Sequence, residues 1–121
     1  QRVRIARALA QKAPILLLDE PTASLDLGHA AQFLSMVKRI ASDQNLTVIL
    51  AIHDLNLAGL FADRVVLLHQ GEVHFDGTPH YVLDAQRLSA VYGTTLHRIE
   101  HPANGRPQIV IEDPTTEDAP A

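Results

Sequence analysis

The chain has 121 residues, a length that fits one compact domain or part of one and excludes a multidomain enzyme. Hydrophobic residues make up 46% and charged residues 20%, a globular composition that argues against wholesale disorder. With a formal net charge of -4, the chain lacks the positive field that sequence-independent nucleic-acid binding usually needs. The lack of cysteine excludes disulfides and thiolate metal sites.

No segment is expected to cross a membrane. The longest clear apolar run, Ile15 to Leu18, is far shorter than the roughly 20 residues that a spanning helix needs. The sequence begins at Gln1 within a pattern of helical spacing, without an initiator methionine or a signal-peptide pattern. We therefore expect it to be part of a longer protein.

The chain opens with a predicted helix. Alanine-rich sequence with apolar residues at helical spacing predicts this helix, and Pro14 forces it to end nearby. Its predicted apolar stripe consists of Val3, Ala6, Leu9 and Ala10.

Two buried strands are predicted on either side of a second helix. Ile15 to Leu18 is a short apolar run bounded by proline and acidic residues, which is typical of a strand covered on both faces in a parallel sheet. Leu27 to Asp43 carries an apolar helical stripe, and Asp26 is placed to cap its first turn. Thr47 to Ile52 is the second strand, and the intervening helix favours parallel pairing of the two.

A helix and a hairpin are predicted next. Asp54 is placed to cap a helix that begins at Leu55. The hairpin runs from Arg64 to His69 and from Glu72 to Phe75, with its turn at Gln70-Gly71.

The last third is predicted to hold two short helices and an edge ribbon. Asp76 to Pro79 breaks the strand pattern, and Asn104-Gly105 predicts a type I′ turn. Pro102 and Pro107 confine the ribbon to a sheet edge, and Glu112 to Ala121 is expected to be disordered. The predicted helices are His80 to Leu83 and Ala85 to Tyr92, closed by Gly93, and the predicted strands are Thr95 to Glu100 and Gln108 to Ile111.

Asp19 and Glu20 end the first buried strand, where α/β sheets present their ligand sites. Because side chains on consecutive strand residues diverge, the two carboxylates can do separate jobs. In a nucleotide hydrolase one such acid holds the Mg²⁺ shell and the other polarises the attacking water. The alternative is that both acids only end a strand in solvent.

His53 follows the second strand in the same way. If the strands are parallel neighbours, His53 emerges at the same sheet edge as Asp19 and Glu20. An imidazole there can hydrogen-bond a γ-phosphate oxygen. The alternative is a structural histidine, and Asp54 is better explained as a helix cap than as catalytic.

Two further polar features leave alternatives open. The loop from Ala23 to Asp26 suits a tight entry into a helix, where Asp26 is either a plain N-cap or part of a functional loop. Three arginines lie in the first visible turns of the first helix, at Arg2, Arg4 and Arg7. Positive charge there is unfavourable against the helix dipole, which favours a nearby anion or acidic partner. The alternative is a solvated basic face on a helix that begins earlier.

Four motifs follow one another along the chain. They are Gln1-Arg2-Val3-Arg4-Ile5-Ala6-Arg7-Ala8-Leu9, Leu16-Leu17-Leu18-Asp19-Glu20-Pro21-Thr22, Ser24-Leu25-Asp26 and His53-Asp54. Their order and spacing closely resemble the second half of an ATP-binding-cassette (ABC) ATPase over nearly the whole chain. The resemblance implies an α/β fold: the carboxyl half of a P-loop NTPase nucleotide-binding domain with mainly parallel central strands, a C-terminal β-hairpin and a small helical extension.

The resemblance also implies ATP and Mg²⁺ as ligands. Asp19 matches the Walker B acid that coordinates Mg²⁺ through water, and Glu20 matches the general base or water-orienting residue. Ser24 and Asp26 belong to the match with the D-loop at the dimer interface, so they are implied as cofactor-binding residues. His53 matches the switch histidine that contacts the γ-phosphate.

Three regions are implied along the chain. They are part of the nucleotide-binding domain at 1–93, a C-terminal β-ribbon at 94–111 and a disordered acidic tail at 112–121. The phosphate-cradling loop G-x-x-x-x-G-K-[ST], the Gln loop and the Leu-Ser-Gly-Gly signature do not occur in the sequence. We therefore expect this chain alone not to hydrolyse ATP, because nothing holds the β- and γ-phosphates in line.

Several segments are similar to the importer branch for iron siderophores, haem and cobalamin. They are Asp26-Leu27-Gly28-His29, His53-Asp54-Leu55-Asn56-Leu57-Ala58, Leu67-Leu68-His69-Gln70-Gly71, Val91-Tyr92-Gly93 and His101-Pro102 with Gly105-Arg106-Pro107. This similarity implies a transport ATPase that energises uptake of an iron chelate or cobalamin. The implied partners are a second ATPase subunit in a head-to-tail dimer, permease subunits and, through them, a substrate-binding protein, at the cytoplasmic face of the bacterial inner membrane.

Two other functions stay open. One is a non-hydrolysing interaction module or truncated pseudo-subunit that dimerises through Ser24 to Asp26. The other is a non-transport ABC ATPase acting on nucleic acid or ribosomes, which the acidic balance disfavours.

Two histidine patterns resemble metal sites only superficially. His97 to His101 matches H-x-x-E-H, but Pro102 and the β-rich alternation favour an extended segment over the helix that a zinc protease needs. His69, His74 and His80 fit no compact ligand set and are expected to be solvated.

Overall fold

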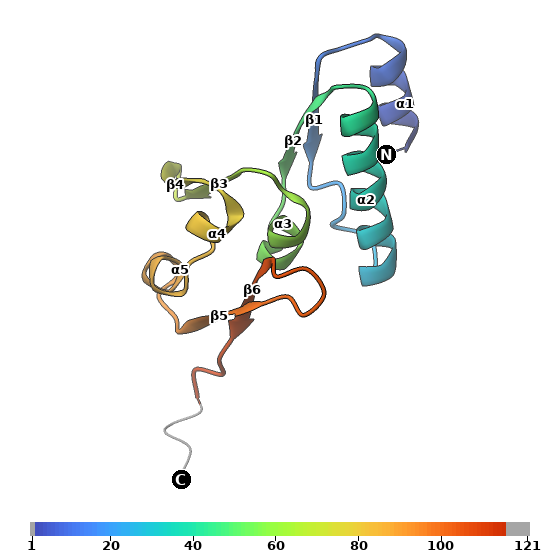
Figure 1. Cartoon of the computed structure of the whole chain (residues 1–121). Coiled ribbons are helices and arrows are strands. Elements are labelled where there is room, and N and C mark those ends of the chain that lie inside the picture. Colours follow the sequence, from blue (N-terminus) through green and yellow to red (C-terminus); the bar gives the residue numbers. More distant parts are fainter. Residues whose placement is uncertain (1, 116–121) are drawn as a thin grey trace. The chain divides into compact units, whose positions relative to one another are not determined.

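The computed structural model describes residues 2–115 (Figure 1). The chain divides into two compact units, Gln1–His53 and Asp54–Ala121, and each is described by itself. The two units are defined by their compactness. The region boundaries that the sequence predicts, at residues 93 and 111, are of another kind and stay predictions. Among the described residues, no helix combines the length and apolar character that crossing a bilayer requires.

The first unit is a pair of parallel strands with two helices. Strand β1 pairs with β2 in register, so that Ile15 lies opposite Thr47 and Asp19 opposite Ala51. The predicted parallel pairing is confirmed, and the carboxyl ends of both strands lie at one edge. The elements are α1 (Arg2–Ala10), β1 (Ile15–Asp19), α2 (Leu27–Asp43) and β2 (Thr47–Ala51).

Helix α2 has the bounds that the sequence predicts. Asp26 is its N-cap in extended conformation, and its carboxylate accepts a hydrogen bond from the His29 N–H at 2.8 Å. The chain leaves the helix through Gln44 and then Asn45, whose φ of 53° lies in the left-handed region. The buried stripe of α2 is Ala30, Phe33, Leu34 and Val37.

The prediction that both strands of this unit are buried is wrong, and the apolar stripe predicted for α1 does not coincide with its buried face. In β2 no residue is fully buried, and Ile49 is 53% exposed. The buried residue of α1 is Ile5, whereas Val3 is 79% exposed; the alanines of the predicted stripe carry little apolar area, so the larger Ile5 decides which face packs. Strand β1 alternates, with Leu16 and Leu18 buried and Leu17 70% exposed. Side chains alternate along a strand, and in this unit the described elements cover only one face.

The second unit packs short helices against two antiparallel ribbons. Its elements are α3 (Leu55–Phe61), β3 (Val65–His69), β4 (Glu72–Gly77), α4 (Pro79–Val82), α5 (Ala85–Tyr92), β5 (Leu96–Glu100) and β6 (Pro107–Ile111). Its buried core is Leu67, Val82, Leu83, Leu88, Leu96 and Ile109. The core draws on both ribbons and two helices, so this unit depends on contacts between distant segments.

The predicted β3–β4 hairpin is confirmed. Gln70 and Gly71 both have positive φ, 51° and 77°, as a type I′ turn requires. Strand β4 runs through Asp76 to Gly77, so the predicted break at Asp76 is wrong. The Arg64 guanidinium donates to both carboxylate oxygens of Asp76, at 2.8 and 2.7 Å, and holds that residue in the ladder.

The two short helices form as predicted. Asp84 caps α5 and accepts from the Arg87 N–H at 3.0 Å. Helix α5 ends at Gly93 with φ 67°, a left-handed C-cap that suits glycine. Thr78 caps α4 in the same way, so that helix begins at Pro79, one residue earlier than predicted.

The β5–β6 ribbon is confirmed as antiparallel, but its turn differs from the prediction. Residues 101–106 connect the strands, and the His101 N–H donates to the Arg106 carbonyl at 2.8 Å. Gly105 has φ 71°, but Asn104 does not have the positive φ of a type I′ turn. Instead its side chain accepts from the Arg106 N–H at 3.0 Å and stabilises a longer loop. Of the tail predicted to be disordered, 112–115 lies beyond the last strand and 116–121 lies outside the described residues.

Candidate functional site

The candidate site lies at the carboxyl ends of β1 and β2. Asp19 is the last residue of β1, Glu20 follows it, and His53 comes two residues after the end of β2. Parallel strands in register bring these ends to one sheet edge. The predicted meeting of the two strand ends is therefore present in the first unit.

Glu20 and His53 are in direct contact. The Glu20 Oε1 atom forms an ion-pair contact with His53 Nε2. The His53 side chain is 90% exposed and the Glu20 side chain 41% exposed, so a ligand can reach both from solvent. The structure thus joins the carboxylate and the imidazole that the sequence singled out separately.

Backbone geometry holds Glu20 in place. Its N–H donates to the Ala51 carbonyl at 2.8 Å, which extends the parallel ladder by one bond beyond β1. Its φ is 46°, in the left-handed region that a residue with a side chain rarely adopts. Such strained positions concentrate at functional sites, and this one redirects the chain immediately after Asp19.

Asp19 is exposed and makes no ion pair within residues 2–115. Its carboxylate oxygens are therefore available to a hard cation such as Mg²⁺, which takes oxygen ligands. The described part of the chain contains no group of three or more metal-ligating side chains. One carboxylate is compatible with the way Mg²⁺ is commonly held, by one or two carboxylates together with water and phosphate oxygens.

The loop between Glu20 and α2 is formed by tight turns. The Ala23 N–H donates to the Glu20 carbonyl at 3.2 Å, and the Leu25 N–H donates to the Thr22 carbonyl at 3.1 Å. Thr22 is buried, whereas Ser24 is exposed. Ser24 and Asp26 make no hydrogen bond or ion pair with Glu20 or His53 within the described residues, so the structure does not bring these two to the carboxylate–imidazole contact.

His29 is a residue of this region that sequence reasoning did not assign. Its backbone N–H and its ring Nδ1 both lie 2.8 Å from Asp26 Oδ1. The backbone hydrogen bond, followed by the ring contact, holds the pKa of Asp26 below its usual range. The available sequence signal was a polar residue three positions after an N-cap, the spacing of a capping box.

The other polar features singled out in the sequence make other contacts within their own units. The arginines of α1 are exposed and form no ion pair within residues 2–115. His97 belongs to an extended strand, as predicted, and its Nε2 lies 2.7 Å from Glu112 Oε2. The His69 ring packs edge-on against His74 and Tyr92, with centroids 5.8 and 5.7 Å apart.

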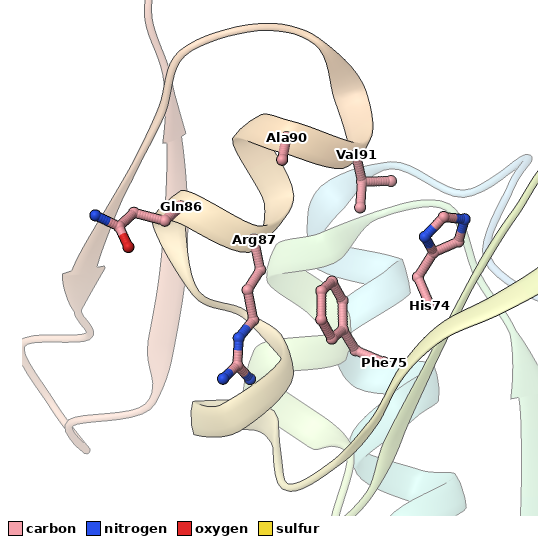
Figure 2. A pocket seen from close by; sticks show the side chains of 6 residues that line it. All are labelled: His74, Phe75, Gln86, Arg87, Ala90 and Val91. Atoms are coloured by element: carbon pink, nitrogen blue, oxygen red, sulfur yellow. The ribbon is translucent and has the colours of Figure 1, made fainter.

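The second unit carries a shallow groove of about 450 Å³ between β4 and α5. Figure 2 shows Phe75 facing α5 beside Arg87, whose guanidinium carbon lies 5.2 Å from the Phe75 ring centroid and 3.9 Å from that of Tyr81. None of the motif residues lines it. The lining residues are His74, Phe75, Gln86, Arg87, Ala90 and Val91.

No protein-family model matches the chain. Among curated relatives, a hemin import ATP-binding protein (HmuV) of Rhodococcus jostii is 46% identical over 86% of this chain and 35% of its own length. HmuV of Vibrio vulnificus is 43% identical over 90% of this chain and 44% of its own length. A cobalamin import ATP-binding protein (BtuD) of Halobacterium salinarum is 45% identical over 87% of this chain and 26% of its own length.

Solved structures agree with this similarity. An inward-facing structure assigned to the metal-chelate type of ABC transporter matches with a TM-score of 0.79 and 28% identity, over 92% of this chain and 45% of that one. CbiO1 from Clostridium perfringens, part of the ABC transporter complex CbiONQ, matches with a TM-score of 0.65 and 30% identity, over 74% and 36%. The predicted α/β fold class is confirmed, and the chain spans less than half the length of these relatives.

Proposed function

Because this chain belongs to the ABC transporter ATPases, we propose that it supplies the Walker B strand, D-loop and switch histidine of a subunit that hydrolyses ATP. The observation that supports this proposal is the contact between Glu20 and His53 at the carboxyl ends of two parallel strands. A base and a phosphate-sensing group must reach a common point in such a site, and these two side chains do.

Each site residue has a distinct role in this proposal. Asp19 holds Mg²⁺ through water, and the ion when bound offsets charge on the phosphate oxygens. Glu20 accepts a hydrogen bond from the attacking water, orients it and takes its proton. His53 donates an N–H to an oxygen of the γ-phosphate, so its contact with Glu20 links the water position to the presence of that phosphate. Ser24 and Asp26 contribute to the nucleotide site from the D-loop at the dimer interface.

Turnover needs more than these residues. A loop that cradles the β- and γ-phosphates does not occur in the 121-residue sequence, so we expect hydrolysis in the full-length protein and none in this chain alone. The division into a nucleotide-binding part at 1–93, a C-terminal ribbon at 94–111 and a disordered acidic tail at 112–121 remains part of this proposal.

The relatives support a transport role. Those named above are hemin and cobalamin import proteins, which supports an importer ATPase that energises uptake of an iron chelate or cobalamin. Its partners are a second ATPase subunit in a head-to-tail dimer, permease subunits and, through them, a substrate-binding protein. The subunit is peripheral on the cytoplasmic face of the cell membrane.

Glu20→Gln in the full-length protein tests the proposal. The amide keeps the size of the side chain but cannot take a proton, so ATP hydrolysis should be lost while ATP binding persists. Gel filtration with MgATP should then show a stabilised dimer. Glu72→Gln, at an exposed β4 carboxylate without an ion pair in the described chain, is the matched control and should behave as wild type. A Glu20→Gln protein that stays monomeric and hydrolyses ATP normally would contradict the role of Glu20.

A further inference from the structure

The backbone of Glu20 departs from what its own side chain and its neighbour favour. Its φ of 46° lies in the left-handed region, which is about fivefold to thirtyfold less populated than the right-handed one when a residue carries a Cβ atom. The next residue, Pro21, pushes the residue before it out of the right-handed region toward extended backbone. Local preferences thus favour an extended Glu20, so contacts elsewhere in the first unit must hold the left-handed one.

The first unit fixes the chain on both sides of Glu20. On the amino-terminal side, the Glu20 N–H donates to the Ala51 carbonyl of β2 at 2.8 Å, which ties Glu20 to the parallel ladder. On the other side, the Glu20 carbonyl accepts the Ala23 N–H at 3.2 Å and closes a turn. Pro21 is the second residue of this turn, the position where turns favour proline. The φ and ψ angles of Glu20 therefore set the direction in which the turn leaves β1.

The turn is anchored in the body of the first unit. Pro21 and Thr22 are both buried, Thr22 to 8% exposure, whereas Ala23 and Ser24 are exposed. The Thr22 carbonyl also accepts the Leu25 N–H at 3.1 Å, so a second turn follows the first. Because the ladder holds one end and the buried pair holds the other, the backbone of Glu20 has little freedom.

This backbone determines where the Glu20 carboxylate lies. Rotation about the N–Cα bond moves the Cβ atom and everything attached to it while β1 and β2 stay in place. A change of φ from 46° to the right-handed value of about −63° is a rotation of about 110°. In the left-handed conformation, Glu20 Oε1 contacts His53 Nε2. A rotation of that size swings the carboxylate away from the imidazole.

Proline and burial each remove one alternative conformation. With an ordinary residue at position 21, the right-handed backbone would be open to Glu20 and favoured over the left-handed one. Pro21 disfavours it. An extended Glu20 would send the turn in another direction and take Pro21 and Thr22 out of their buried positions. The left-handed conformation is the one that remains.

We propose that Pro21 and Thr22 are positioning residues for Glu20: together they hold its backbone in the left-handed conformation and so keep its carboxylate against His53. The inference rests on the proposed ATPase function and deepens it. Both residues act through Glu20, so their effect belongs to the step in which this carboxylate orients the attacking water and takes its proton. Small displacements of a catalytic group cost large factors in rate.

Pro21→Ala in the full-length protein tests the inference. We expect kcat for ATP to fall about fivefold or more while KM stays within about twofold, because Glu20 gains the right-handed alternative and the phosphate cradle is unchanged. Pro79→Ala is the matched control, since Pro79 is also buried and begins α4 in the second unit. It should leave kcat at the wild-type value.

A second readout separates positioning from general damage to the fold. Pro21→Ala added to Glu20→Gln should still give the dimer that MgATP stabilises, because in that protein the position of the side chain no longer limits turnover. Loss of this dimer would show that Pro21 serves nucleotide binding or folding, and the inference would be wrong.

The remaining outcomes distinguish the inference from the proposed function. If Glu20→Gln loses turnover but Pro21→Ala lowers kcat no more than Pro79→Ala does, the inference is wrong and the ATPase function stands. If Glu20→Gln keeps full turnover, the role of Glu20 and the inference fall together. Should Pro21→Ala not fold, Thr22→Ala is held to the same criteria.

Discussion

Gly59 of α3 lies so close to the Pro107 carbonyl of β6 that replacing it should change the stability of the protein. Glycine inside a helix is ordinarily replaced by alanine with a gain of up to about 1 kcal/mol, because alanine loses less conformational entropy. At Gly59 we expect the opposite sign. The added Cβ would meet the Pro107 carbonyl oxygen at 2.2 Å, so the ribbon must withdraw by about 0.8 Å to reach 3.0 Å.

The magnitude follows from what withdrawal costs. Overpacking typically destabilises by about 1 to 3 kcal/mol. Moving the ribbon also stretches the two hydrogen bonds between Asn56 and Ile109, each worth about 1 kcal/mol. After the gain in helix preference is subtracted from these two costs, Gly59→Ala should lower the free energy of unfolding by about 2 to 4 kcal/mol.

Calorimetric unfolding of the full-length protein measures this effect as a fall in Tm. Gly28→Ala is the matched control, since Gly28 also lies in a helix and its added Cβ meets only Asp26 Oδ1, at an ordinary 3.7 Å. That variant should unfold at the wild-type temperature or slightly above it. A Gly59→Ala protein as stable as Gly28→Ala would refute the backbone contact between α3 and β6.

Two further predictions concern the first unit. His53→Ala should abolish ATP turnover in the full-length protein while equilibrium nucleotide binding is largely retained; an unchanged kcat would contradict its role. Asp26→Asn keeps the helix cap but removes its negative charge. In the folded wild type, the hydrogen bonds from His29 lower the pKa of Asp26 below 3.8, so the stability that this charge contributes depends on pH. A lowered folded pKa stabilises the protein above the unfolded pKa and ceases to do so as pH falls through the folded value. The Tm difference between wild type and Asp26→Asn should therefore shrink as the pH falls below about 4, and a difference that grows toward acid in that range would refute the assignment.

Local patterns predicted most of the first unit. Apolar spacing and the Asp26 cap predicted the bounds of α2, and two buried runs around a helix predicted parallel strands. The error over β1 has a physical origin. Sequence shows that a strand is apolar on both faces, but whether Leu17 is covered depends on which other segments pack against it.

The meeting of Glu20 and His53 could be predicted from the sequence, but the backbone geometry at Glu20 could not. Strand order placed Glu20 and His53 at one edge, but the left-handed backbone of Glu20 had no signal, because a glutamate seldom adopts it. The hydrogen bonds that join α3 to the β5–β6 ribbon could not be predicted, for another reason. Asn56 bonds to Ile109, 53 residues away, and Arg106 bonds to Gly59, 47 residues away, and neither propensity nor periodicity predicts contacts between such distant residues.

The hydrogen bonds between α3 and the β5–β6 ribbon also have a consequence for the order of folding. Helix α3 is synthesised early, but the groups that fix it, Arg106 and the Ile109 backbone, lie 44 to 53 residues further along the chain. On the ribosome, this helix must wait for the ribbon before its ends are held, and closing so long a loop is slow compared with forming a local turn. Residues 55–61 should therefore be among the last of the second unit to gain protection from a protease during synthesis.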